Sequence, residues 1–259
     1  MLLEEKVSKQ KPITIYWTPF SVVNRQYEQL LVDVPFKSVV RDIVKRKPKN
    51  PITPKSNHSP HKVPEGFYQR CSAFHTLADN MYYFEFPFDV TVQFDENGTF
   101  IPFYRMHWFT ERGQTIEGAF NADFLYELAF FADEPLEMSI TPPYLHQTPQ
   151  SSYGFVTAVK WDIGQWFRPV NFLFQLWPGI REFSIKTGEV FAYVHFHTER
   201  PVVFKQVELT EKMLEIGRAC FNHKEIFPNT PLSILYEKFK RKGVKSILIE
   251  EMKKNVIKN

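Results

Sequence analysis

The stretch FEFPFDVTVQF, residues 84–94, alternates between large apolar side chains and side chains that are mostly polar. One parity carries Phe84, Phe86, Phe88, Val90, Val92 and Phe94. A period of two, sustained this long, is typical of a β-strand with one buried face. The stretch therefore predicts a strand beginning near Tyr82 and a fold built on sheets.

The strand is followed by a turn signal, Asn97-Gly98. Both residues accept positive φ, which makes this dipeptide a strong indicator of a β-hairpin. A two-residue turn here would set Phe94 opposite Ile101, an apolar pair. Because Pro102 cannot donate to a sheet, we expect the return strand to lie at an edge.

The composition favours strands. The 259 residues include 26 Phe, 11 Tyr and 5 Trp, with 19 Pro and only 10 Gly. Aromatic side chains pack well on a pleated, half-buried surface. The length suits one large β domain or two small ones.

Further strands are predicted at short intervals, with a turn every eight to twelve residues. They cover 12–17, 136–141, 153–161, 166–177, 181–186, 190–197 and 202–208. This spacing predicts a mainly β (α+β overall) fold, an antiparallel β-sandwich or barrel of jelly-roll, cupin-like or dUTPase-like type. Residues 121–131 fit a helix or a strand equally well.

The pattern changes to helical spacing after Leu209. Thr210 is a candidate N-cap, Thr230-Pro231 starts a second helix that Gly243 ends, and a last helix covers about 245–254. We therefore divide the chain into a lead-in with one strand (1–35), a basic Pro-rich loop (36–66), a β-rich core (67–209) and a basic helical tail (210–259).

Basic residues concentrate in two segments, 41–62 and 238–258, although the formal net charge is only +3. Each segment is either a solvated surface or a site for an acidic partner or nucleic acid, since phosphate binding depends on Lys and Arg.

Two cysteines, Cys71 and Cys220, give no disulfide framework, and we expect both to be reduced and buried. The N-terminus does not have the pattern of a secretory signal, and no apolar run is long enough to span a membrane. A cytoplasmic protein without a membrane partner is expected.

Familiar catalytic signatures are absent from the sequence, including GxxxxGK[ST], GxGxxG, GxSxG, HExxH and CxxC. The most compact polar group is GEVFAYVHFHTE, residues 188–199. His195 and His197 share a strand face and could converge on one divalent metal ion, with Glu199 as a third ligand. The alternative is a pair of partly exposed histidines on the same strand face as Phe191 and Tyr193. The opposite face, with Val190, Ala192, Val194 and Phe196, would then point into the core.

A ligand pocket is a second candidate site. Arg168, Asn171 and Gln175 lie on an aromatic-rich strand, where they either line a pocket or form the polar rim of a sheet. Arg105 and His107 fall on the strand face shared by Phe88 and Val90. They mark either the mouth of a cavity or the point where this face meets solvent. His146 is a further histidine without a spacing pattern.

Several motifs resemble an uncharacterised β-rich family of marine bacteriophages and bacteria. They are CSA at 71–73, FEFPFDVTV at 84–92, ITPPY at 140–144, RPVNFLF at 168–174 and IKTGEVFAYVHF at 185–196. The resemblance covers about 70–208 and implies a phage or marine bacterial origin, but no activity. The last motif also resembles the first metal motif of cupins and the closing strands of dUTPase-like barrels.

These observations lead to three hypotheses. The first is a non-enzymatic binding or structural-accessory protein of phage origin, forming homo-oligomers through an aromatic sheet face. The second is a cupin-like metal-dependent enzyme that uses His195 and His197, with Glu199 as ligand or base. The third is a nucleic-acid-associated protein that binds through 41–62 and the tail.

Overall fold

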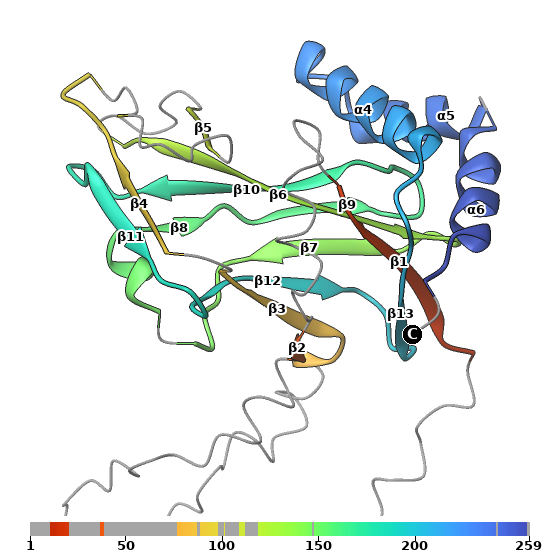
Figure 1. Ribbon diagram of the computed structural model, residues 1–259, viewed down its shortest axis with the longest axis horizontal. Coiled ribbons are helices and arrows are strands. Elements are labelled where there is room, and N and C mark those ends of the chain that lie inside the picture. Colours follow the sequence, from red (N-terminus) through yellow and green to blue (C-terminus); the bar gives the residue numbers. More distant parts are fainter. Residues whose placement is uncertain are drawn as a thin grey trace, which may run out of the picture.

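The computed structural model describes residues 11–20, 37–38, 77–86, 89–97, 101, 109–111, 119–146, 148–241 and 243–257. These residues form a six-stranded, a five-stranded and a two-stranded sheet, with a layer of helices at one end (Figure 1). The basic loop 41–62, Cys71, Arg105 and His107 lie outside the described residues.

The six-stranded sheet has the order β13-β1-β6-β10-β8, and β5 also pairs with β6. Its strands are β1 (Ile13–Pro19), β5 (Phe109–Glu111), β6 (Asn121–Ala132), β8 (Gly154–Val156), β10 (Pro169–Leu176) and β13 (Val202–Gln206). The pairing of β1 with β13 is parallel, and the other pairings are antiparallel. Residues 121–131 are therefore a strand, and the strand predicted near the N-terminus belongs to the main sheet.

The five-stranded sheet has the order β2-β3-β12-β7-β9, and β11 pairs with β4. The strands are β2 (Lys37–Ser38), β3 (Met81–Glu85), β4 (Val90–Gln93), β7 (Glu137–Thr141), β9 (Val159–Asp162), β11 (Glu182–Ile185) and β12 (Val190–Phe196). The described strands do not close into a barrel. The prediction of a mainly β, sandwich-like fold is confirmed.

The core between the sheets is largely aromatic. Phe84 of the five-stranded sheet contacts Phe172 of the six-stranded sheet with ring centroids 5.7 Å apart, and Phe124 contacts Phe191 at 4.8 Å. Phe183 of β11 contacts Phe124 at 5.9 Å, so the two-stranded sheet shares this core. Offset and edge-to-face aromatic contacts add about 0.5–1.5 kcal/mol each beyond their buried area.

The stretch 84–94 departs from its prediction as a single strand. It is divided between β3, paired with β12, and β4, paired with β11, so two different sheets use it. The expected parity still points inward, because Phe84, Phe86, Val92 and Phe94 are all buried. Alternation reports which side chains are buried and does not show where a strand breaks.

The turn after β4 brings the chain back: the amide of Ile101 donates to the carbonyl of Gln93 at 2.9 Å. The predicted return strand, 102–108, lies outside the described residues. The prediction of one buried face fails for β3, where Met81 and Tyr83 are also buried, on the outer side.

Three helices cover the outer face of the six-stranded sheet: α4 (Glu211–Ile226), α5 (Leu232–Arg241) and α6 (Val244–Lys254). The Thr210 side chain accepts from the amide of Met213 at 3.3 Å, which confirms the predicted N-cap. Leu235, Phe239 and Met252 form a second buried cluster with Phe131, whose ring centroid lies 6.2 Å from that of Phe239. None of the described helices has the length and apolar character needed to cross a membrane.

Candidate ligand cavity

A cavity of about 260 Å³ lies beneath the segment that joins β7 to β8. This segment contains Pro142-Pro143 and a 3₁₀ turn, η3 (Pro149–Ser152). Phe174 of β10 and Phe191 of β12 line the inner wall. The cavity therefore lies where the two large sheets meet the connecting segment.

Gln150 is the most constrained polar residue of this lining. Its side chain is 2% exposed, and its amide nitrogen donates to the carbonyls of Val190 at 2.7 Å and Phe191 at 3.2 Å. Its Oε1 atom accepts no hydrogen bond from any described residue. We refer to this space as the Gln150 cavity.

A β-bulge in β12 explains why the Gln150 side chain can hydrogen-bond to the carbonyls of Val190 and Phe191. The register between β12 and β3 shifts between Val190 and Ala192, so Phe191 is the extra residue. A bulge interrupts the ladder and redirects side chains. Gln150 bonds the carbonyls at the bulge, and Phe191 turns into the core instead of the outer face predicted for it.

The inner part of the lining is apolar, and the outer part adds polar side chains such as His146, Thr148 and Ser151. Phe174 and Phe191 lie at a centroid distance of 6.1 Å and an interplanar angle of 26°, and Phe155 and Val156 add to the wall. None of the described residues that line the cavity is Asp, Glu, Lys or Arg. A charged ligand would lose its hydration here without gaining an ionic partner.

His146 and Tyr193 fix the connecting segment. His146 lines the cavity, is 7% exposed, and its Nδ1 is hydrogen-bonded to the Tyr193 hydroxyl. That hydroxyl also accepts from the amide of Leu145 at 3.1 Å, and Tyr83 packs against the imidazole with ring centroids 5.1 Å apart. These contacts hold the outer wall against the five-stranded sheet.

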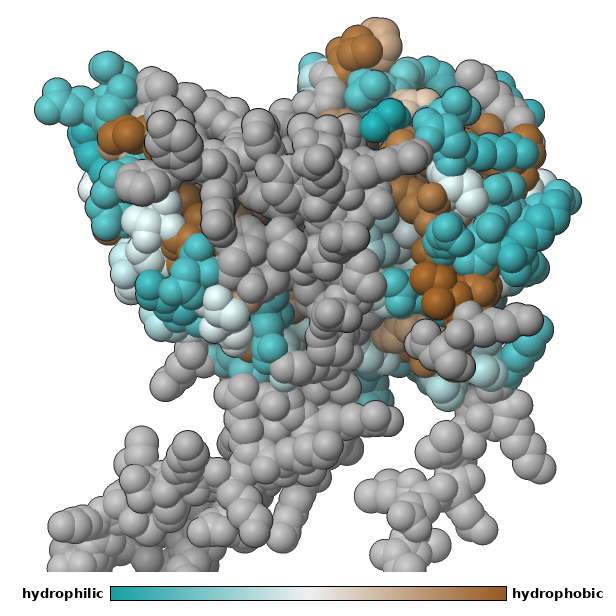
Figure 2. Space-filling model, viewed as in Figure 1, coloured by the Kyte–Doolittle hydropathy of each residue, from teal (hydrophilic) through white to brown (hydrophobic). Residues whose placement is uncertain are grey.

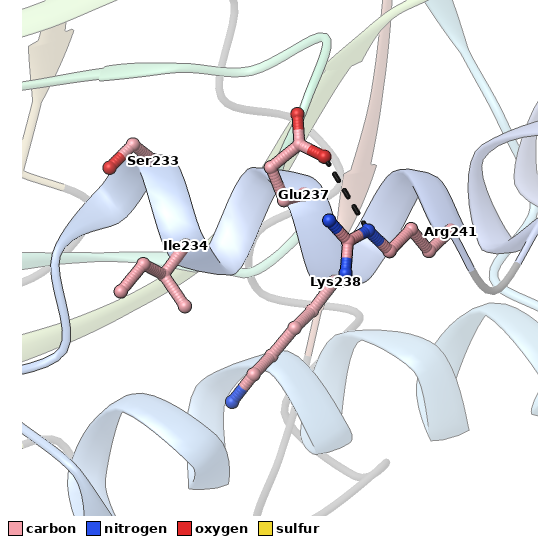
Figure 3. A pocket seen from close by; sticks show the side chains of 5 residues that line it. All are labelled: Ser233, Ile234, Glu237, Lys238 and Arg241. Atoms are coloured by element: carbon pink, nitrogen blue, oxygen red, sulfur yellow. Dashed lines mark ion pairs between the residues drawn. The ribbon is translucent and has the colours of Figure 1, made fainter.

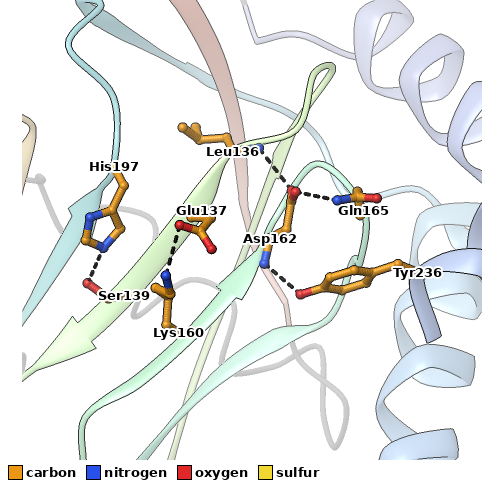
Figure 4. A network of polar contacts seen from close by, with 8 residues as sticks. All are labelled: Leu136, Glu137, Ser139, Lys160, Asp162, Gln165, His197 and Tyr236. Carbon is orange, nitrogen blue, oxygen red and sulfur yellow. Dashed lines mark hydrogen bonds and ion pairs between the residues drawn. The ribbon is translucent and has the colours of Figure 1, made fainter. Parts of the chain in front are cut away.

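His195 lies farther along β12, on the same outer face as Tyr193, and His197 directly follows the end of the strand. Their ring centroids are 4.3 Å apart, and His197 Nε2 lies 2.9 Å from the Ser139 hydroxyl (Figure 4). Burial lowers the pKa of His195 below its usual value, and the neighbouring His197 lowers it further. Burial and then the Lys160 charge lower the pKa of His197.

The predicted third metal ligand is placed differently. Glu199 is exposed and follows the end of β12. Among the described residues, no group of three or more His, Cys, Asp or Glu side chains is arranged to hold a metal ion. The structure thus pairs the two histidines and leaves metal binding a prediction.

The predicted pocket residues of β10 do not line the Gln150 cavity. Asn171 donates to both carboxylate oxygens of the buried Asp123, at 3.0 and 2.9 Å, and Arg168 donates to the Asn171 side-chain oxygen. Arg168 also lies over the Phe221 ring of α4, 5.6 Å from its centroid. Gln175 is 8% exposed. Asn171 and Gln175 belong to the opposite face of β10 from Phe174, and Arg168 precedes the strand.

A second polar network ties β7, β9 and α5 together (Figure 4). The Asp162 carboxylate accepts from the amides of Leu136 at 3.0 Å and Gly164 at 2.8 Å. Glu137 and Lys160 form an exposed ion pair of 2.9 Å beside it. These bonds satisfy backbone groups at strand ends, so the network supports the fold.

The helical tail has its own shallow hollow, of about 310 Å³, lined by side chains of α5 (Figure 3). Arg241 there pairs with Glu237 at 3.7 Å, and Lys238 points toward α4. Hydrophobic residues are also exposed at the free end of α4, including Ile226 at 68% and Phe227 at 52% (Figure 2). Binding of an acidic partner or nucleic acid to this tail stays a prediction.

Sequence reasoning did not identify the Gln150 cavity. Gln150 stands between a proline and two serines without any motif, and the bulge that it bonds leaves no pattern in the sequence. His146 belongs to no spacing pattern in the sequence either. Of the motifs in the sequence, only ITPPY at 140–144 lies in this region.

Comparisons with known proteins add no family or function: no protein-family model, curated protein or solved structure matches the chain.

Proposed function

We propose that this protein is a binding protein whose ligand is a small, uncharged, planar molecule held in the Gln150 cavity. The observation that supports this most is Gln150, a buried residue of the cavity lining whose Oε1 atom receives no hydrogen bond from the described residues. A buried acceptor left without a donor costs about 1–3 kcal/mol. A ligand that brings a donor would recover this free energy.

The wall chemistry narrows the ligand class. Phe174, Phe191 and Phe155 offer flat aromatic surfaces, which favour planar rings. The absence of Asp, Glu, Lys and Arg from the described lining residues favours a neutral molecule. The volume lies just below the roughly 300–1,000 Å³ of drug-sized sites, so the ligand has one or two fused rings.

Indole and benzofuran form a matched pair of probes. They have the same bicyclic shape, but only indole has an N–H donor. We expect indole to bind with a Kd on the order of 1 mM, which is common for so small a ligand. Benzofuran should bind about five- to tenfold more weakly, since one hydrogen bond contributes about 1 kcal/mol.

Two adjacent serines provide a matched pair of variants. Ser151 lines the cavity and Ser152 does not, and both donate to the carbonyl three residues earlier, at 2.8 and 2.7 Å. We expect Ser151→Trp to block indole in an NMR titration and Ser152→Trp to leave binding unchanged. Equal binding by both variants, or equal binding of indole and benzofuran, would contradict the proposal.

A further inference from the structure

A second site, separate from the Gln150 cavity, is formed by the histidine pair of β12. The strand lies between β3 and β7, and His195 has Met81 and Ser139 as its cross-strand partners. The two imidazoles lie side by side on the outer face, with ring centroids 4.3 Å apart and an interplanar angle of 40°. The sheet holds both backbones, so the pair is preorganised.

We propose that His195 and His197 bind one divalent transition-metal ion in a cis arrangement, with copper or nickel preferred over zinc. Imidazole is a good ligand for all three metals. The preference follows from the distance between the rings.

Geometry distinguishes the metals. With a metal–nitrogen bond of about 2.0 Å, each ring centroid lies about 3.2 Å from the ion. Two ligands at a right angle then have centroids about 4.5 Å apart, and two tetrahedral ligands have centroids about 5.2 Å apart. The observed 4.3 Å lies nearer to the separation for a right angle, the arrangement that square-planar or tetragonal copper and nickel adopt.

The surroundings also favour binding. The Ser139 hydroxyl, 2.9 Å from His197 Nε2, fixes the orientation of that ring, as outer-shell partners do in metal sites.

Charge also supports the site. Asp79 is close enough to act electrostatically on His195, and Glu137 on His197. These carboxylates would offset part of the charge of the ion, whereas the Lys160 charge, 2.9 Å from Glu137, opposes a cation at His197. The remaining coordination positions would be taken by water.

Copper and nickel titrations of the full chain test the proposal. One equivalent of Cu²⁺ should give an electron paramagnetic resonance spectrum with splitting from two nitrogen ligands. His195→Gln or His197→Gln should each remove that two-nitrogen signature and weaken binding at least about tenfold. His223→Gln, a histidine of α4, is the matched control and should change neither.

Calorimetry with Ni²⁺ and Zn²⁺ tests the geometry, because a right-angle arrangement should bind nickel more tightly than zinc. Unchanged copper binding in both the His195→Gln and the His197→Gln variant would rule out this site. Zinc binding as tight as nickel would overturn the cis arrangement.

Discussion

The hydroxyl oxygen of Tyr236, on α5, accepts a hydrogen bond of 2.8 Å from the backbone amide of Asp162, on β9. The helical layer packs on the outer face of the six-stranded sheet, whereas β9 is an edge strand of the five-stranded sheet. Tyr236 therefore joins α5 to the second sheet (Figure 4). The helices of the tail thus contact both large sheets.

Replacement of Tyr236 by Phe tests this link. The Asp162 amide would lose its acceptor in a buried position, so we expect the free energy of unfolding to fall by about 1–2 kcal/mol. Urea denaturation measures the loss. Tyr144→Phe is the control, because that hydroxyl is on a 52% exposed residue and contacts only the weak acceptor Met81 Sδ. Equal effects of the two variants would show that the Tyr236 bond contributes nothing.

Gly217 tests how closely α4 approaches the sheet. A Cβ at this position would lie 2.4 Å from a ring carbon of Phe20, a residue with no exposed surface. Alanine gains about 1 kcal/mol of helix propensity, but overpacking a rigid core costs about 1–3 kcal/mol. We expect Gly217→Ala to destabilise the protein by about 1 kcal/mol in urea denaturation. Ser246→Ala, on the exposed side of α6, should be neutral or slightly stabilising, and the same result for Gly217→Ala would refute the close packing.

The histidine pair predicts a pH dependence. Both folded-state pKa values lie below the ordinary value of 6.5, mainly because of burial. The unfolded chain then binds more protons as pH falls through about 6.5, so the free energy of unfolding should decrease in that direction. Urea denaturation between about pH 7.5 and about pH 5.5 should show a smaller decrease for the His195→Gln/His197→Gln double variant. An unchanged decrease would mean that other groups cause it.

Cys220 should be chemically inert in the folded protein. Burial raises the pKa of its thiol to about 12, and thiolate is the reactive form. In a Cys71→Ser background, a disulfide reagent should label one thiol only after unfolding. Rapid labelling under native conditions would show that α4 opens readily.

The sequence predicted those features that depend on local periodicity. The N-cap at Thr210, the strand at 136–141 and the inward parity of Phe84 and Val92 are all confirmed. These features depend on neighbours within one turn or one strand, so a local pattern can reveal them.

Local sequence patterns did not predict the features that depend on contacts between distant segments. The break between β3 and β4 occurs because two different strands, β12 and β11, pair with them. Phe191 is turned inward by a bulge opposite β3, and Gln150 bonds the same bulge from 40 residues away. Asn171 and Asp123, 48 residues apart, form their contact in a similar way. No local period encodes such contacts.

The most direct test of the proposed binding function is a crystal structure of the protein soaked with indole. We expect indole to pack against Phe174 and Phe191 at the inner wall, with its nitrogen within about 3.2 Å of Gln150 Oε1. Ordered water alone on that oxygen at saturating indole, or indole bound only elsewhere, would contradict it.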